Sequence, residues 1–145
     1  MKTPPFHLAF PIIDLEETRH FYVDVIGCSV GREAARWIDF DFFGHQISAH
    51  VRPEACATDA DNPVDGDRVP VRHFGCILEM DQWTALRDRL IQWNTEFIIE
   101  PKIRFQGRPG EQATLFIRDP SGNALEFKAF ADMSLVFAPQ PDEDP

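Results

Sequence analysis

Cysteine, basic residues and long apolar runs are scarce in this chain of 145 residues. Its three cysteines, Cys28, Cys56 and Cys76, are odd in number and form no CxxC pair, which indicates reduced thiols in a cytoplasm. Lysine and arginine number 14 against 24 aspartates and glutamates, and a net charge of −10 disfavours nucleic acid or an anionic membrane as partner. No apolar run approaches the length of a membrane span, and the N-terminus lacks a signal pattern. We therefore expect a cytoplasmic globular protein.

What the sequence does contain is one pattern written twice, with a histidine at the same place in each copy. The segments 6–10 and 72–76 carry His7 and His73, and each leads into an acidic helix start. Further on, each copy has a glycine turn that opens a strand, at 43–48 and at 121–126. The spacing from His7 to His73 is about 66 residues, and such self-similarity indicates an internal duplication.

Each copy predicts a strand, a helix and then three strands. Module one, about 5–52, is expected to hold strands at 7–11, from Val30, at 37–42 and at 46–51, with a helix over 15–26 capped by Asp14. Module two, about 69–130, is expected to hold strands at 73–78, 97–99, 113–118 and 124–130, with a helix capped by Asp81. The pattern predicts one α+β domain over 1–132; a ferredoxin-like pair fits less well, because each copy ends in three consecutive strands.

Three stretches lie outside this repeat. The acidic segment 53–68 is predicted to be a linker between the modules, with a lid over the site as the alternative reading. The stretch from Lys102 to Glu111, rich in Arg and Gly, is predicted to be a loop. The tail 133–145 is rich in Pro and acidic residues beyond Phe137, and we expect it to be disordered there.

The matched positions indicate a metal site. On the first strand of each copy, His7 or His73 lies opposite the large apolar residues, and on the last strand Glu126 faces away from Leu125. Symmetric modules bring matched positions together, so two His and one Glu could meet as ligands of one divalent ion. This donor set is typical of Fe(II), although Mn, Zn, Co or Ni also fit. Aligning the glycine turns places Ser48 opposite Glu126, so the fourth symmetric position holds no strong ligand.

Other residues on the same face are candidates for substrate chemistry. His50 lies two residues beyond Ser48 and could act as a general acid or base, with a solvated strand-end His as the equal alternative. Gln112 and Phe116 are expected to line a substrate pocket, although Phe116 could also be an ordinary packing residue.

The doubled strand–helix–three-strand pattern, the positions of His7, His73 and Glu126, and the segment 119–127 (DPSGNALEF) together resemble the vicinal oxygen chelate superfamily. This superfamily includes glyoxalase I, fosfomycin and bleomycin resistance proteins and type I extradiol dioxygenases. The resemblance covers roughly residues 5–130. It implies paired βαβββ modules whose curved mixed sheets enclose a metal site, and a homodimer.

The resemblance also implies a reaction class. Extradiol dioxygenases and fosfomycin-modifying enzymes use His, His and Glu, as here, whereas glyoxalase I has a carboxylate where Ser48 stands. The sequence therefore favours an extradiol-type dioxygenase acting on a catechol-like small molecule, with His50 as acid/base. The extradiol Tyr would fall near Phe116, and the chain's one tyrosine is Tyr22. A glyoxalase-like isomerase or lyase, a thiol transferase and a metal-free antibiotic-binding protein are the alternatives.

Overall fold

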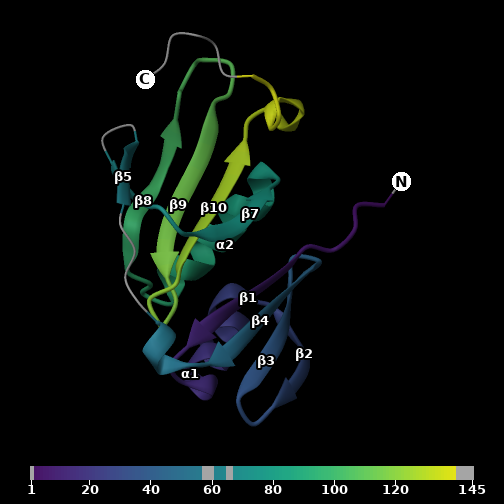
Figure 1. Ribbon diagram of the computed structural model, residues 1–145. Helices are drawn as coiled ribbons and strands as arrows, with labels where there is room; N and C mark the ends of the chain where they lie inside the picture. The colour runs from purple at the N-terminus through teal and green to yellow at the C-terminus, as the bar shows by residue number, and fades with distance from the viewer. Residues whose placement is uncertain (1, 57–60, 65–66, 140–145) are drawn as a thin grey trace. The chain divides into compact units, whose positions relative to one another are not determined.

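The computed structural model describes residues 2–56, 61–64 and 67–139 (Figure 1). The chain divides into two compact units, of which unit 1 comprises residues 1–60 with 118–124, and unit 2 comprises residues 61–117 with 125–145. Each unit is built on a four-stranded sheet. None of the helices in these described ranges is long and apolar enough to cross a membrane.

Unit 1 contains a mixed sheet and a helical segment that follows the first strand. Its elements are β1 (His7–Ile12), α1 (Leu15–Arg19), the π-helix η1 (His20–Ile26), β2 (Ser29–Ala34), β3 (Trp37–Phe42) and β4 (His45–Val51). The strands lie in the order β1-β4-β3-β2, with β1 parallel to β4 and the other pairs antiparallel. The predicted strand, helix and three strands are confirmed.

Unit 2 repeats this arrangement. Its sheet and helix are β7 (Phe74–Leu78), α2 (Met80–Gln92), β8 (Phe97–Arg104), β9 (Gln112–Arg118) and β10 (Ala124–Phe130). The strand order is β7-β10-β9-β8, in which β7 is parallel to β10 and β8 is antiparallel to β9 (Figure 1). The α+β class with two βαβββ modules is therefore confirmed, strand by strand.

The strand register supports the alignment of the two copies. In unit 1, Ala9 on β1 pairs with Ser48 on β4, and in unit 2, Gly75 on β7 pairs with Glu126 on β10. Ala9 and Gly75 each stand two residues beyond the histidine of their copy. Ser48 and Glu126 therefore occupy equivalent positions.

The cores follow from the amphipathic pattern of each helix. In unit 1, Tyr22 is fully buried and its ring lies against Phe40, with centroids 5.0 Å apart. In unit 2, Trp83, Leu86 and Leu90 are buried along α2, and the Trp83 indole donates a 2.8 Å hydrogen bond to the Phe127 carbonyl. Each helix is thereby packed on its own sheet, which leaves the other face of the sheet for a site.

The connection between β9 and β10 packs within unit 1. The Asp119 carboxylate accepts 2.9 Å hydrogen bonds from the backbone of Ser121 and Asn123 and from the Tyr22 hydroxyl. Gly122 has φ of +90°, a conformation that favours glycine. Burial raises the pKa of the Asp119 carboxyl, against the opposing effect of these hydrogen bonds. The Asp-Pro-Ser-Gly-Asn motif thus builds a structured turn.

The helix predicted over 15–26 is confirmed, whereas the helix start predicted in unit 2 is wrong. In unit 1 the helix is α-helical to Arg19 and continues as the π-helix η1, in which the Gly27 amide donates to the Tyr22 carbonyl five residues back, at 3.1 Å. In unit 2, Glu79 rather than Asp81 caps α2, because Glu79 and Gln82 form a reciprocal capping box.

The stretches around the modules contain more regular structure than predicted. The expected loop from Lys102 begins later, because β8 continues to Arg104 and pairs with β9. Within the predicted linker 53–68, η2 (Pro53–Ala55) is a short 3-10 helix, and β5 (Asp61–Val64) pairs with β6 (Asp67–Pro70) as an antiparallel hairpin. After β10 comes the 3-10 helix η3 (Met133–Leu135). The disorder predicted beyond Phe137 falls largely on 140–145, outside the described residues.

Candidate functional site

In unit 2, the structure brings two predicted ligands together. His73, just before β7, places its Nε2 3.2 Å from Oε1 of Glu126 on β10. The other carboxylate oxygen of Glu126 accepts a 2.6 Å hydrogen bond from the Thr114 hydroxyl on β9. The side chains of His73 and Glu126 are 27% and 14% exposed, so both are largely withdrawn from solvent.

The ring of His73 is held from behind by the backbone. Its Nδ1 lies 2.7 Å from the Pro70 carbonyl oxygen. A carbonyl can only accept, so Nδ1 carries the hydrogen and donates it. The neutral ring then has its lone pair on Nε2, the nitrogen that faces Glu126.

The pKa values of this pair shift in opposite directions. The hydrogen bond with Glu126 raises the pKa of His73, against the effect of burial, and the Pro70 carbonyl adds to the rise. For Glu126, burial alone would raise the pKa, but hydrogen bonds from His73 and Thr114 outweigh it and the pKa falls below its ordinary value. Without a metal the pair therefore favours an imidazolium beside a carboxylate.

Strand β6 lies on the same face of the sheet as this pair. Val69 packs in one buried cluster with Ile99 and Phe116, and the Phe116 ring meets the His73 ring edge-on at 5.0 Å. Asp67 forms ion pairs with Lys102 and, at 3.3 Å, with Arg104. The hairpin strand thus covers part of the face that carries His73 and Glu126.

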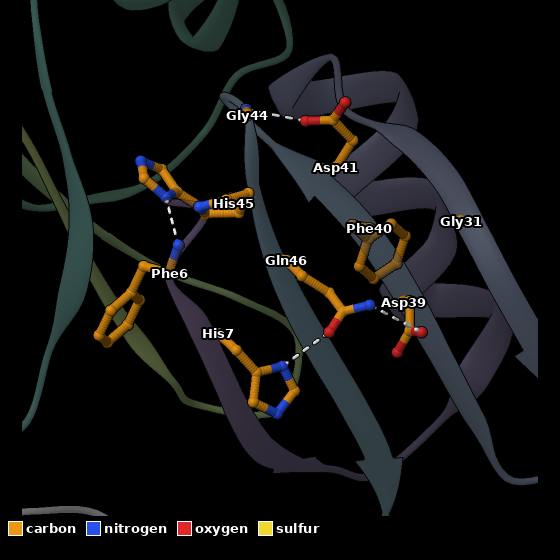
Figure 2. A pocket seen from close by; sticks show the side chains of 10 residues that line it. Phe6, His7, Gly31, Asp39, Phe40, Asp41, Gly44, His45 and Gln46 are labelled. Carbon is orange, nitrogen blue, oxygen red and sulfur yellow. Dashed lines mark hydrogen bonds between the residues drawn. The ribbon is translucent and has the colours of Figure 1, made fainter. Parts of the chain in front are cut away.

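The third predicted ligand, His7, lies in unit 1 at the start of β1. It is exposed and borders a hollow of about 450 Å³ whose wall includes His45, Gln46 and Asp39 (Figure 2). The Nδ1 of His7 lies 2.8 Å from Oε1 of Gln46, its register partner on β4. Gln46 therefore supports His7 much as the Pro70 carbonyl supports His73.

A buried carboxylate stands behind Gln46. Asp39 on β3 is 3% exposed and accepts hydrogen bonds from the Ser48 hydroxyl at 2.6 Å and from the Gln46 amide nitrogen at 3.4 Å. The Arg32 guanidinium lies 3.4 Å from it. Ser48 stands at the position in unit 1 that Glu126 has in unit 2. There it donates a hydrogen bond to a carboxylate, whereas Glu126 is itself a carboxylate.

The remaining predicted site residues are placed as follows. His50 is exposed on β4, and strand alternation puts it on the same face as Gln46 and Ser48. Gln112 begins β9 and donates a 3.4 Å hydrogen bond to the Gly110 carbonyl, and Phe116, 1% exposed, contacts His73. Within either unit, no three His, Cys, Asp or Glu side chains of the described residues gather as metal ligands would.

Sequence reasoning missed several residues of these surroundings. Asp39, Gln46 and Thr114 alternate onto the ligand face of their strands, and that alternation could have identified them. Pro70 acts through its carbonyl, and no side-chain pattern signals this. His45 also belongs to these surroundings, because it borders the hollow and its Nδ1 accepts a 2.8 Å hydrogen bond from the Phe6 amide (Figure 2).

Comparison with known proteins identifies the fold's family. The sequence profile of the Glyoxalase/Bleomycin resistance protein/Dioxygenase superfamily matches residues 5–127. The glyoxalase/bleomycin resistance protein/dioxygenase of Alicyclobacillus acidocaldarius is 33% identical, with a TM-score of 0.75 over 92% of this chain and 96% of that one. Among curated protein sequences, none matches the chain.

More distant structures share the fold alone. The fosfomycin resistance protein FosX of Listeria monocytogenes is 15% identical, with a TM-score of 0.64 over 89% of this chain and 94% of that one. The lactoylglutathione lyase of Agrobacterium tumefaciens is 19% identical, with a TM-score of 0.61 over 88% and 94%. From its two βαβββ units and the match over residues 5–127, the chain belongs to the Glyoxalase/Bleomycin resistance protein/Dioxygenase superfamily.

Proposed function

We propose that the chain is a metal-dependent enzyme in which His7, His73 and Glu126 are the protein ligands of one divalent ion. The observation that carries this proposal is the 3.2 Å separation of His73 Nε2 and Glu126 Oε1. Two ligand atoms about 2.1 Å from one ion and at right angles to each other lie about 3 Å apart. The pair therefore already has the spacing of neighbouring ligands.

The orientation of the pair supports the same proposal. Nδ1 of His73 is committed to the Pro70 carbonyl, so Nε2 is the nitrogen left to coordinate. In metal sites a ligating His usually donates its other N–H to a carbonyl or carboxylate, and a ligating carboxylate is itself hydrogen-bonded, as Glu126 is by Thr114.

The donor set also bears on the metal. Two imidazoles and one carboxylate with open positions are typical of Fe(II), and Mn, Zn, Co and Ni are the alternatives. When bound, such an ion would polarise two neighbouring oxygen atoms of a substrate and leave room for a further small ligand.

For the reaction, we propose an extradiol-type dioxygenase that acts on a catechol-like substrate. His50 projects from the ligand face of β4 and is exposed, so it can exchange a proton with a substrate hydroxyl. Gln112 is half-buried on the corresponding face of β9, where its amide can bind a substrate oxygen. A homodimer and a cytoplasmic setting belong to the same proposal.

Oxygen uptake with a panel of catechols tests the reaction. Protein loaded anaerobically with Fe(II) should consume oxygen and develop the absorbance of a ring-cleavage product. The His50→Ala variant should keep its metal and lose most of this activity, whereas His20→Ala, which removes an exposed histidine on η1 that bonds Asp24, should not.

Two other results would overturn the dioxygenase. No uptake with any catechol, together with turnover of a glutathione adduct, would place the chain with lyases such as the lactoylglutathione lyase of A. tumefaciens, or with isomerases or thiol transferases. Tight binding of an antibiotic by metal-free protein, without turnover, would make it a binding protein.

A further inference from the structure

Asp39 is a buried carboxylate of unit 1 that has no role in the proposed chemistry. It is 3% exposed on β3, and its carboxylate accepts from Ser48 Oγ, Gln46 Nε2 and Arg32 Nε at 2.6, 3.4 and 3.4 Å. All three groups are donors, as a carboxylate requires. A buried carboxylate supplied in this way can dictate how its neighbours are oriented, since turning one of them would leave it facing another acceptor.

Gln46 is the neighbour whose orientation matters. Its amide has a donor end and an acceptor end, and Asp39 can bind only the donor end. The acceptor end, Oε1, is therefore turned toward His7, 2.8 Å from Nδ1 (Figure 2). The opposite orientation would place the amide oxygen against the Asp39 carboxylate.

The orientation of Gln46 in turn determines the tautomer of His7. An amide oxygen can only accept, so Nδ1 of His7 must carry the hydrogen. The neutral ring then has its lone pair on Nε2. We infer that Asp39 and Gln46 are positioning residues that hold His7 as the Nδ1–H tautomer, with Nε2 available to a metal ion; the metal half of this inference rests on the proposed function.

His45, which borders the same hollow, is expected to be the opposite tautomer to His7. Its Nδ1 accepts from the Phe6 amide, which can only donate, so its neutral ring carries the hydrogen on Nε2. Two histidines that border one hollow are therefore held in opposite tautomers, the first by an acceptor and the second by a donor (Figure 2).

The test reads the tautomers directly. Ring ¹⁵N shifts from long-range ¹H–¹⁵N spectra distinguish a protonated from an unprotonated nitrogen, and they can be measured on chelator-treated protein at alkaline pH, where imidazole is neutral. We expect His7 and His73 to show protonated Nδ1, and His45 to show protonated Nε2. In Gln46→Leu, His7 alone should change and become largely the Nε2–H form.

Two further variants separate positioning from a general structural effect. Gln46→Glu keeps an acceptor beside Nδ1 and should retain the Nδ1–H form of His7. Ser48→Ala removes one hydrogen bond to Asp39 but leaves the bond from Gln46, and should leave His7 unchanged. His73 serves as the internal control in every spectrum, because its partner is the Pro70 carbonyl.

Metal titration with Co(II) supplies the second readout. Gln46→Leu should weaken binding by about 10- to 100-fold, the usual cost of losing the partner of a ligating His. An Nε2–H tautomer for His7 in the wild-type protein, or a His7 tautomer unchanged in Gln46→Leu, would overturn the inference even if metal binds. If Co(II) does not bind but the tautomers are as predicted, the proposed function and the role of His7 Nε2 as a metal ligand are refuted. The orientation of His7 by Gln46 would still stand.

Discussion

The two units solve one problem by different means. In unit 1, a side-chain relay from Asp39 through Gln46 holds His7, and in unit 2 the Pro70 carbonyl holds His73. The strand position of Gln46 in unit 1 corresponds to Ala124 in unit 2, which has no group to offer. Both histidines nevertheless present Nε2. The position of the histidine is thus common to the copies, whereas the support behind it is particular to each.

A second pair of contacts shows the same divergence. In unit 1, the hydroxyl is on β4 (Ser48) and the carboxylate is on β3 (Asp39); in unit 2, the hydroxyl is on β9 (Thr114) and the carboxylate is on β10 (Glu126). Both hydrogen bonds are 2.6 Å long. The hydroxyl and the carboxylate have thus changed places between the two units. In unit 2 the carboxylate, Glu126, is at the proposed ligand position, and in unit 1 the carboxylate, Asp39, is buried on the neighbouring strand.

The largest difference between the units is expected in how much stability is lost when a side chain is changed where the two parallel strands meet. A Cβ at Gly75 would lie 1.5 Å from the Glu126 carbonyl oxygen, so β7 and β10 approach more closely than any side chain allows. Gly75→Ala must push Glu126 away from His73, and we expect the free energy of unfolding to fall by about 3 kcal/mol or more. Urea denaturation of metal-free protein measures this change.

The matched position in unit 1 is the control. Ala9 already carries a Cβ opposite Ser48, so Ala9→Gly should reduce the free energy of unfolding by only about 0.5–1 kcal/mol. Equal losses in Ala9→Gly and Gly75→Ala would show that the close approach of β7 and β10 has no special importance.

Removal of the Thr114 or the Ser48 hydroxyl should affect metal binding to different extents in the two units. Thr114→Val deletes the hydrogen bond that orients the Glu126 carboxylate and that helps to lower its pKa. We expect metal affinity to fall by about 10- to 100-fold. Ser48→Ala, in which the affected carboxylate is Asp39, should change affinity much less. Titration with Co(II) measures both, and similar losses would contradict the assignment of Glu126 as the ligand.

The smallest effect concerns pH in the metal-free protein. The pKa of His73 is raised above 6.5, so its stabilising interaction with Glu126 is complete below that value and is lost as pH rises through the folded-state pKa. The pKa of Glu126 is lowered from 4.5, so its contribution is present above that value and is lost as pH falls through the folded-state pKa.

The pair should therefore add on the order of 1 kcal/mol to the free energy of unfolding between these two limits. Denaturation at a series of pH values should show the decline on the alkaline side in the wild-type protein and a much weaker decline in Glu126→Gln. A decline of the same size in this variant would mean that His73 draws its stability from another partner.

Much of the fold was readable in the sequence. The duplication around His7 and His73 and the alternation of the strands predicted both modules, and the equivalence of Ser48 and Glu126 is confirmed by the register. Helix ends were less predictable. Glu79 and Asp81 are both acidic and lie two residues apart, and the sequence did not show that Glu79 is the N-cap, through its reciprocal hydrogen bonds with Gln82. The β5–β6 hairpin was hidden by its acidic composition, although Val69 is buried against the sheet.

The candidate site was only partly readable for a different reason. Histidine and glutamate are conspicuous ligands, and the structure brings His73 and Glu126 together. Their supports are not conspicuous, because Gln46 matters through its strand partner His7 and Pro70 matters through its backbone. Such contacts depend on register and on loop path, and side-chain chemistry alone does not reveal them.

The most direct test is the metal content of anaerobically purified protein. Wild-type protein and His20→Ala should each hold one divalent ion per His7–His73–Glu126 set, and His7→Ala and Glu126→Ala should hold almost none. Equal metal content in wild-type protein and both ligand variants, or none in the wild-type protein after exposure to Fe(II), Zn(II) and Co(II), would contradict a His-His-Glu centre.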